Sequence, residues 1–149
     1  MNEDKLSICT VTLGADAELV NENLIELNKL YKNIKLYIVC PKKDEHLFKK
    51  ALIHKNYEVI TEDKFISFND FQSIFEELSI DLTYRDQFKS RLQWYYALFL
   101  KFFFIHRFFE SNDSKLVIWE GDSVILKKID FFKDDFSLLY VWVNYYHGI

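Results

Sequence analysis

A chain of 149 residues, half of them hydrophobic, is long enough to form one domain with a buried core and too apolar to remain disordered. Three glycines and one proline leave few tight turns, which disfavours an all-β fold built from hairpins. The net charge of −4 argues against a nucleic-acid-binding protein, because such proteins usually carry a basic face.

Strand-like runs alternate with helical periodicity in the first half of the chain. The first strand is predicted over Leu6–Leu13, and the next helix over Ala17–Tyr31, with Asp16 as its N-cap. The elements predicted next are a strand over Ile34–Cys40, a helix over Lys43–His54, a strand over Tyr57–Ile60 and a loop over Lys64–Asp70.

Two pairs that resemble capping boxes, Ser67 with Asp70 and Thr83 with Asp86, predict the starts of two further helices. These helices are expected to run to Leu78 and from about Tyr84 to Phe109, and strands follow over Leu116–Trp119 and Phe136–Val143. The order predicts an α/β fold for residues 1–149 as a single domain, with a mostly parallel sheet covered by helices on both faces.

Both cysteines, Cys9 and Cys40, lie in strand-like runs and are predicted to be buried, reduced thiols. No signal peptide is visible, and the nearly apolar stretch Trp94–Ile105 is shorter than the ~20 residues that span a bilayer. We therefore expect a cytoplasmic protein, and peripheral contact with the inner face of the membrane remains open. The four histidines show no metal-ligand spacing to one another.

The tripeptide Glu120-Gly121-Asp122 directly follows a short apolar strand. Side chains alternate along a strand, so Glu120 and Asp122 can face the same way, and a glycine lets a ligand or backbone come close. Two converging carboxylates repel each other unless a cation joins them, which predicts a divalent metal bound by Asp122 and Glu120. Acidic residues after a strand are also common in ordinary loops.

Arg91 and Lys101 lie within about 80° of each other on the predicted long helix, at 100° per residue. Lys101 interrupts an aromatic run that is predicted to be core, and an unpaired ammonium is costly to bury there. Either both side chains face a phosphate or the acidic pair, or both reach solvent from the edges of the helix.

Gly14-Ala15-Asp16 follows the first strand and opens a helix, whose N-terminus is expected to offer free N–H groups to an anion. Asp16 either accepts hydrogen bonds from a base or ribose or serves only as the N-cap. Neither a GxGxxG fingerprint nor a P-loop motif is present. Because ligands bind at the carboxyl ends of parallel strands, this turn, Thr61–Asp63 and the acidic tripeptide are expected at one edge.

Most of the chain resembles bacterial nucleotide-sugar glycosyltransferases of the GT-A type, most strongly from about Arg91 to Phe132, with their Asp-x-Asp motif written here as Glu-Gly-Asp. The matching pieces are Trp94, Leu100-Lys101, Val117-Ile118-Trp119, Glu120-Gly121-Asp122, Ser123-Val124-Ile125-Leu126 and Ile129-Asp130-Phe131-Phe132. The resemblance implies a GT-A or Rossmann-like fold, and Mn²⁺ or Mg²⁺ held by Asp122 against the donor diphosphate. Glu120 would contact the ribose or a metal-bound water.

The implied activity is transfer of a sugar from a nucleoside-diphosphate sugar to a cell-surface glycan or lipid-linked acceptor. The residues implied to contact the sugar nucleotide are Gly14, Asp16, Arg91, Lys101, Glu120 and Gly121. Family members usually continue well beyond this length, so the resemblance implies a donor-binding half without its acceptor half. One alternative is an inactive remnant or interaction protein, with a homodimer as one outcome. A second is a flavodoxin-like phosphate-handling or signalling domain, for which the first strand lacks the expected acidic cluster.

Overall fold

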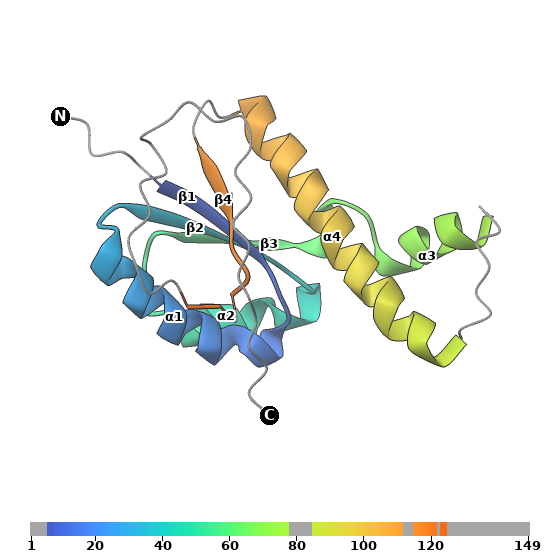
Figure 1. Ribbon diagram of the computed structural model, residues 1–149, viewed down its shortest axis with the longest axis horizontal. Coiled ribbons are helices and arrows are strands. Elements are labelled where there is room, and N and C mark those ends of the chain that lie inside the picture. The colour runs from blue at the N-terminus through green and yellow to red at the C-terminus, as the bar shows by residue number, and fades with distance from the viewer. Residues whose placement is uncertain (1–5, 78–84, 112–114, 122, 125–149) are drawn as a thin grey trace.

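The computed structural model describes residues 6–77, 85–111, 115–121 and 123–124, with the backbone alone described for Phe75 and residues 85–91. Strands and helices alternate along the chain as predicted (Figure 1). The elements are β1 (Leu6–Val11), η1 (Gly14–Asp16), α1 (Ala17–Leu30), β2 (Ile34–Cys40), η2 (Lys42–Asp44), α2 (Glu45–Ala51), β3 (Tyr57–Thr61), η3 (Glu62–Lys64), α3 (Phe68–Glu77), α4 (Arg85–Ser111) and β4 (Leu116–Ile118).

The described strands form one parallel sheet in the order β3-β2-β1-β4. The chain adds β2 and then β3 on one side of β1. It then passes through α3 and α4 and adds β4 on the other side of β1. β1 therefore has β2 on one side and β4 on the other, and the carboxyl ends of β1 and β4 flank the switch in strand order, where ligands bind in such sheets.

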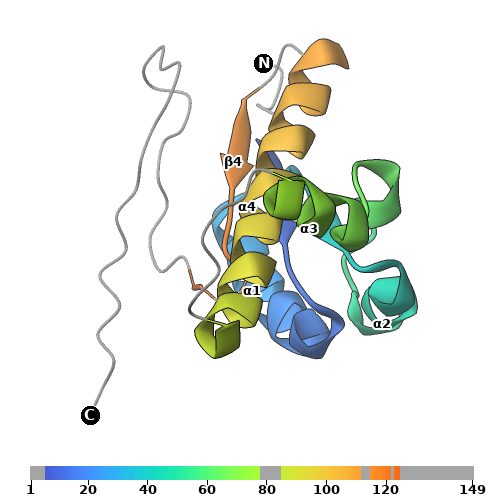
Figure 2. The ribbon, with the colours of Figure 1, turned by 90° about the vertical axis from the view of Figure 1, so that its right-hand side faces the viewer.

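Helices cover both faces of the sheet, as expected for a parallel sheet (Figures 1 and 2). On one face, α1 and α2 pack against strand residues that include Ile8 and Leu36. On the other face, α3 and α4 pack against residues of the opposite strand parity, which include Cys9 and Tyr37. The α/β fold with helices on both faces is therefore confirmed for the described residues.

The sequence patterns predicted these helices and strands correctly, but several of their first or last residues were wrong. The first strand ends at Val11 rather than Leu13, whose side chain is exposed. The Ser67/Asp70 box is confirmed, since the Asp70 N–H donates to Ser67 Oγ at 3.1 Å. Asp16 occupies the predicted N-cap position of α1, but its side chain makes no capping hydrogen bond to the helix.

The prediction that the aromatic run of α4 is entirely core is wrong for one side of the helix. The buried residues follow a spacing of four and are Leu92, Tyr96, Leu100, Phe104 and Phe108. Trp94 and Phe102, by contrast, are 60% and 67% exposed. A helix lying on a sheet can bury only the stripe that faces it, and α3 reaches only part of α4 (Figure 2).

Both cysteines are buried free thiols, as predicted. Among the helices that the structure describes, none combines the length and the apolarity needed to cross a bilayer. Thr83, the predicted strand Phe136–Val143 and the candidate metal ligand Asp122 lie outside the described residues.

Candidate functional site

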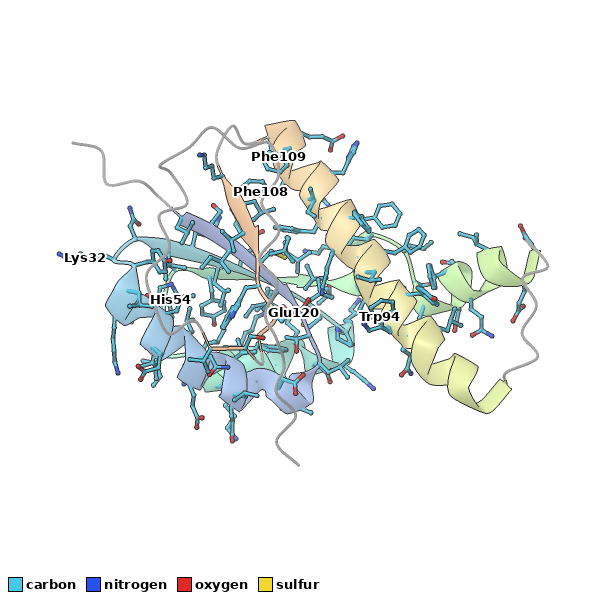
Figure 3. All side chains as sticks on the ribbon, in the orientation of Figure 1. Lys32, His54, Trp94, Phe108, Phe109 and Glu120 are labelled. Carbon is cyan, nitrogen blue, oxygen red and sulfur yellow. The ribbon has the colours of Figure 1, made fainter. Side chains whose placement is uncertain are left out.

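A cleft of about 740 Å³ opens at the carboxyl edge of the sheet, where the strand order switches. Asp16 borders it after β1, Glu62 after β3, and Glu120 with Gly121 after β4. Trp94 lines the opposite wall from α4, and Figure 3 shows it near Glu120 on this side of the molecule. The predicted meeting of three acidic turns at one edge is therefore confirmed for these carboxylates.

Lys101 of α4 forms an ion pair with Glu120, directly after β4. The Lys101 side chain is only 15% exposed, so this carboxylate supplies the partner that an ammonium inside an aromatic helix needs. Of the two alternatives for Lys101, the structure therefore favours contact with the acidic motif. The Glu120 side chain remains 53% exposed and keeps access to a ligand in the cleft.

Gly121 is buried where the turn after β4 meets α1. Its N–H donates to Thr10 Oγ1 at 3.1 Å, and its carbonyl accepts a hydrogen bond from Asn23 Nδ2 at 2.8 Å. An ideal Cβ at this position would lie 2.7 Å from Val20 Cγ2. The close approach that this glycine allows is therefore to α1, in the form of backbone packing.

Trp119 fixes the acidic turn from its other side. Its N–H donates to the Cys9 carbonyl at 2.7 Å, and its indole Nε1 donates to the Ser123 carbonyl at 2.9 Å. Sequence reasoning did not assign anchoring roles to Thr10 or Asn23. Asn23 could have been found as a polar residue on the apolar stripe of α1, since it is buried beside Leu24.

Gly14 packs under the cleft and is not one of its lining residues. Its N–H donates to Asp44 Oδ2 at 2.9 Å, and an ideal Cβ would lie 2.8 Å from the Asp44 Cβ. The expectation of a free N–H group at Gly14 is therefore wrong, because an acidic side chain from η2 already occupies it. Asp16 does line the cleft, and its Oδ2 accepts a hydrogen bond from Thr12 Oγ1 at 2.8 Å.

Of two further predicted site residues, the structure describes one in part and the other not at all. Arg91 belongs to α4, but its side chain lies outside the described part of the chain, as does all of Asp122. Within the residues that the structure describes, no three His, Cys, Asp or Glu side chains come together to hold a metal ion. The assignment of Asp122 and Glu120 as metal ligands stays a prediction.

Carboxylates outnumber basic side chains among the described residues that line the cleft, where the lysine is Lys43 and the acids are Asp16, Asp44, Glu62 and Glu120. Burial raises the pKa of Glu62 above its ordinary value. Burial, followed by the neighbouring Glu62 charge, also raises the pKa of Tyr96, whose hydroxyl donates to the Ile66 carbonyl at 2.5 Å. Such a cleft attracts cations and hydroxyl-rich ligands and repels a bare phosphate.

Comparison of the chain with protein-family models, with curated proteins and with solved structures finds no match. The case for a function therefore rests on the residues of the cleft.

Proposed function

We propose that the cleft binds a nucleoside-diphosphate sugar together with Mn²⁺ or Mg²⁺, as the donor site of a glycosyltransferase that transfers the sugar to a glycan or lipid-linked acceptor. The observation that carries the proposal is the position of Glu120. It leaves β4 at the strand-order switch, borders the cleft and pairs with Lys101. An acidic turn at this point of a parallel sheet suits a ligand that brings both a metal and a phosphate.

The charge of the cleft supports a requirement for a metal. Carboxylates such as Asp16 and Glu62 would repel a diphosphate that entered without a counter-ion. A divalent ion bound there would neutralise the leaving diphosphate and so ease cleavage of the sugar–phosphate bond. Mg²⁺ commonly takes one or two carboxylates and completes its shell with substrate phosphates and waters, so Glu120 with Asp122 would be enough protein ligands.

The size and the walls of the cleft also suit the donor. A volume of about 740 Å³ falls within the usual range for small-molecule sites, roughly 300–1,000 Å³. Trp94 and Phe68 line it, and such rings offer flat apolar surfaces to a base or a sugar. Lys43 lines the cleft and can contact phosphate oxygens, and Lys101, which pairs with the lining residue Glu120, would reach them beside that partner.

Ligand-induced stabilisation tests the proposal. A panel of nucleoside-diphosphate sugars with Mn²⁺ should include one that raises the melting temperature by several degrees, since ligand at 100 times Kd adds about 2.7 kcal/mol. Asp122→Ala and Glu120→Gln should weaken this binding by about tenfold or more. Glu22→Gln, an exposed acid on α1 away from the cleft, should leave it unchanged. Absence of any shift in the folded wild type would refute the proposal.

A turnover assay separates the transferase from the inactive remnant. The ion pair between Glu120 and Lys101 favours neither, because a paired carboxylate can still contact a ribose. Donor binding with sugar transfer to a panel of glycan acceptors would establish the enzyme. Metal-dependent donor binding without transfer or donor hydrolysis would establish the remnant instead.

A further inference from the structure

Helix α4 carries a second apolar stripe on the side that faces away from the sheet. The buried stripe follows a spacing of four residues, whereas the second stripe follows alternating spacings of three and four. Its members, here named the outer seam, are Tyr95, Leu98, Phe102, Ile105 and Phe109. This is the a/d pattern of a helix that packs along another helix, and it holds for two heptads, a length of about 21 Å.

Three of the five members of the outer seam, Tyr95, Phe102 and Phe109, are exposed, and Leu98 and Ile105 are half-buried. Phe102 and Phe109 are 67% and 52% exposed, and Phe99 and Phe103 widen the apolar strip beside them. At the edge of this strip Phe99 packs against Phe71 of α3, with ring centroids 5.0 Å apart. At about half exposure, the five exposed rings of the strip together offer roughly 500 Å² to a partner; they are Tyr95, Phe99, Phe102, Phe103 and Phe109.

That area is more than half of the about 800 Å² that each partner buries in a standard stable interface, before Leu98 and Ile105 are added. It is also near the upper end of the largest apolar patch on ordinary monomers, about 300–600 Å². Charged side chains flank the strip without interrupting it. Lys101 forms its ion pair with Glu120, and His106 Nδ1 lies 3.5 Å from Glu110 Oε1 on the same helix. The outer seam is therefore continuous enough for another helix to pack along it.

We propose that α4 packs along α4 of a second copy of this chain, in a twofold dimer whose helices cross at Phe102. A heptad seam selects a helix as its partner, and each copy supplies an identical seam. In an isologous interface the same patch serves both subunits, and a residue on the axis meets its own counterpart. Phe102 is the central position of the seam and its most exposed ring, so it lies on that axis.

Sedimentation equilibrium of the full chain tests the dimer. The wild type should show twice the 18.0 kDa of the chain over a wide range of concentration. Phe102→Glu should weaken association by at least about a hundredfold, because it removes the central ring from both copies and opposes like charges. Ile53→Glu is the matched control, since Ile53 is a still more exposed apolar residue far from α4, and this variant should remain a dimer.

Crosslinking tests the same geometry without a new charge. Because Cys9 and Cys40 are buried, Phe102→Cys supplies one accessible thiol per chain, and mild oxidation should join two copies. Ile53→Cys should not crosslink. A monomeric wild type, a dimer that persists in Phe102→Glu, or failure of Phe102→Cys to crosslink would each overturn the proposal. A monomer in which Phe102→Glu lowers the melting temperature would assign the seam to a contact within the chain, and a monomer that binds vesicles through it would assign it to a membrane.

Discussion

Replacing Gly121 with alanine puts a methyl group where the acidic turn meets α1. An ideal Cβ there lies 2.7 Å from Val20 Cγ2 and 3.1 Å from Thr10 Oγ1. Both neighbours are completely buried, so neither side chain can swing into solvent to make room. The substitution therefore has to push the turn away from α1, which also strains the hydrogen bond between Asn23 and the Gly121 carbonyl.

The size of the effect follows from the overlap. Two carbon atoms are most favourable at about 3.5–4.0 Å, so the new methyl sits about 1 Å too close to Val20. Overpacking of this kind costs about 1–3 kcal/mol, and we expect about 2 kcal/mol for Gly121→Ala. Val20→Ala alone should also cost about 2 kcal/mol, because it removes two buried carbons at about 0.8 kcal/mol each and leaves a cavity.

The double variant distinguishes steric conflict from any other cause. In the Val20→Ala background, the methyl group introduced by Gly121→Ala occupies the space that Cγ2 has left. The double variant should therefore lose about 1–2 kcal/mol less unfolding free energy than the two single variants lose together. Urea unfolding followed by tryptophan fluorescence, to which Trp119 contributes from its buried position beside this turn, measures the free energies of unfolding of all three variants. Additive effects, or a Gly121→Ala variant as stable as the wild type, would refute the assignment of this glycine to packing against α1.

Three further predictions concern the titratable groups around the cleft. Because burial raises the pKa of Glu62, the folded state holds that proton more tightly and stability falls as the pH rises from the unfolded to the folded pKa. Glu62→Gln should therefore raise the melting temperature at pH 7. At a pH well below the ordinary carboxyl pKa, the same variant should leave the melting temperature unchanged. An increase in melting temperature that does not depend on pH would contradict burial of the charge as the cause. Lys101→Met should change the unfolding free energy by about 1 kcal/mol or less, since Glu120 is half exposed, and a loss above about 3 kcal/mol in urea unfolding would contradict that. Burial raises the pKa of both thiols, that of Cys40 to about 12, so a thiol reagent at pH 8 should label neither Cys40 nor Cys9 until denaturant is added, and rapid native labelling would contradict their burial.

The existence of the elements could be read from the sequence because the signals are local. Runs of β-branched residues mark β1 and β2, and the Ser67/Asp70 box marks the start of α3. The fold class followed from the order of these elements, since strands that alternate with helices join as parallel neighbours. Ends were less certain: Leu13 is apolar and extends the β1 pattern, but it lies beyond the last strand residue and is exposed.

The gathering of acidic turns at one edge could also be inferred, because all carboxyl ends of a parallel sheet meet there. The contacts that each turn residue makes at this edge could not be inferred from the sequence. Gly14 and Gly121 look alike in sequence as glycines after strands, and both are explained by close packing, against Asp44 and Val20 respectively. Neither neighbour is adjacent in the chain, so no local pattern could identify it.

Sequence alone determined the alternation of strand and helix, the α/β class and the edge at which the polar turns meet, because each depends on spacing along the chain. Only the tertiary structure decided which stripe of α4 is buried, and that Lys101 turns toward Glu120 rather than to solvent. An aromatic helix has apolar residues on every side, so its periodicity cannot say which side meets the sheet. That choice depends on the shape of the facing surface, which exists only after distant segments have packed together.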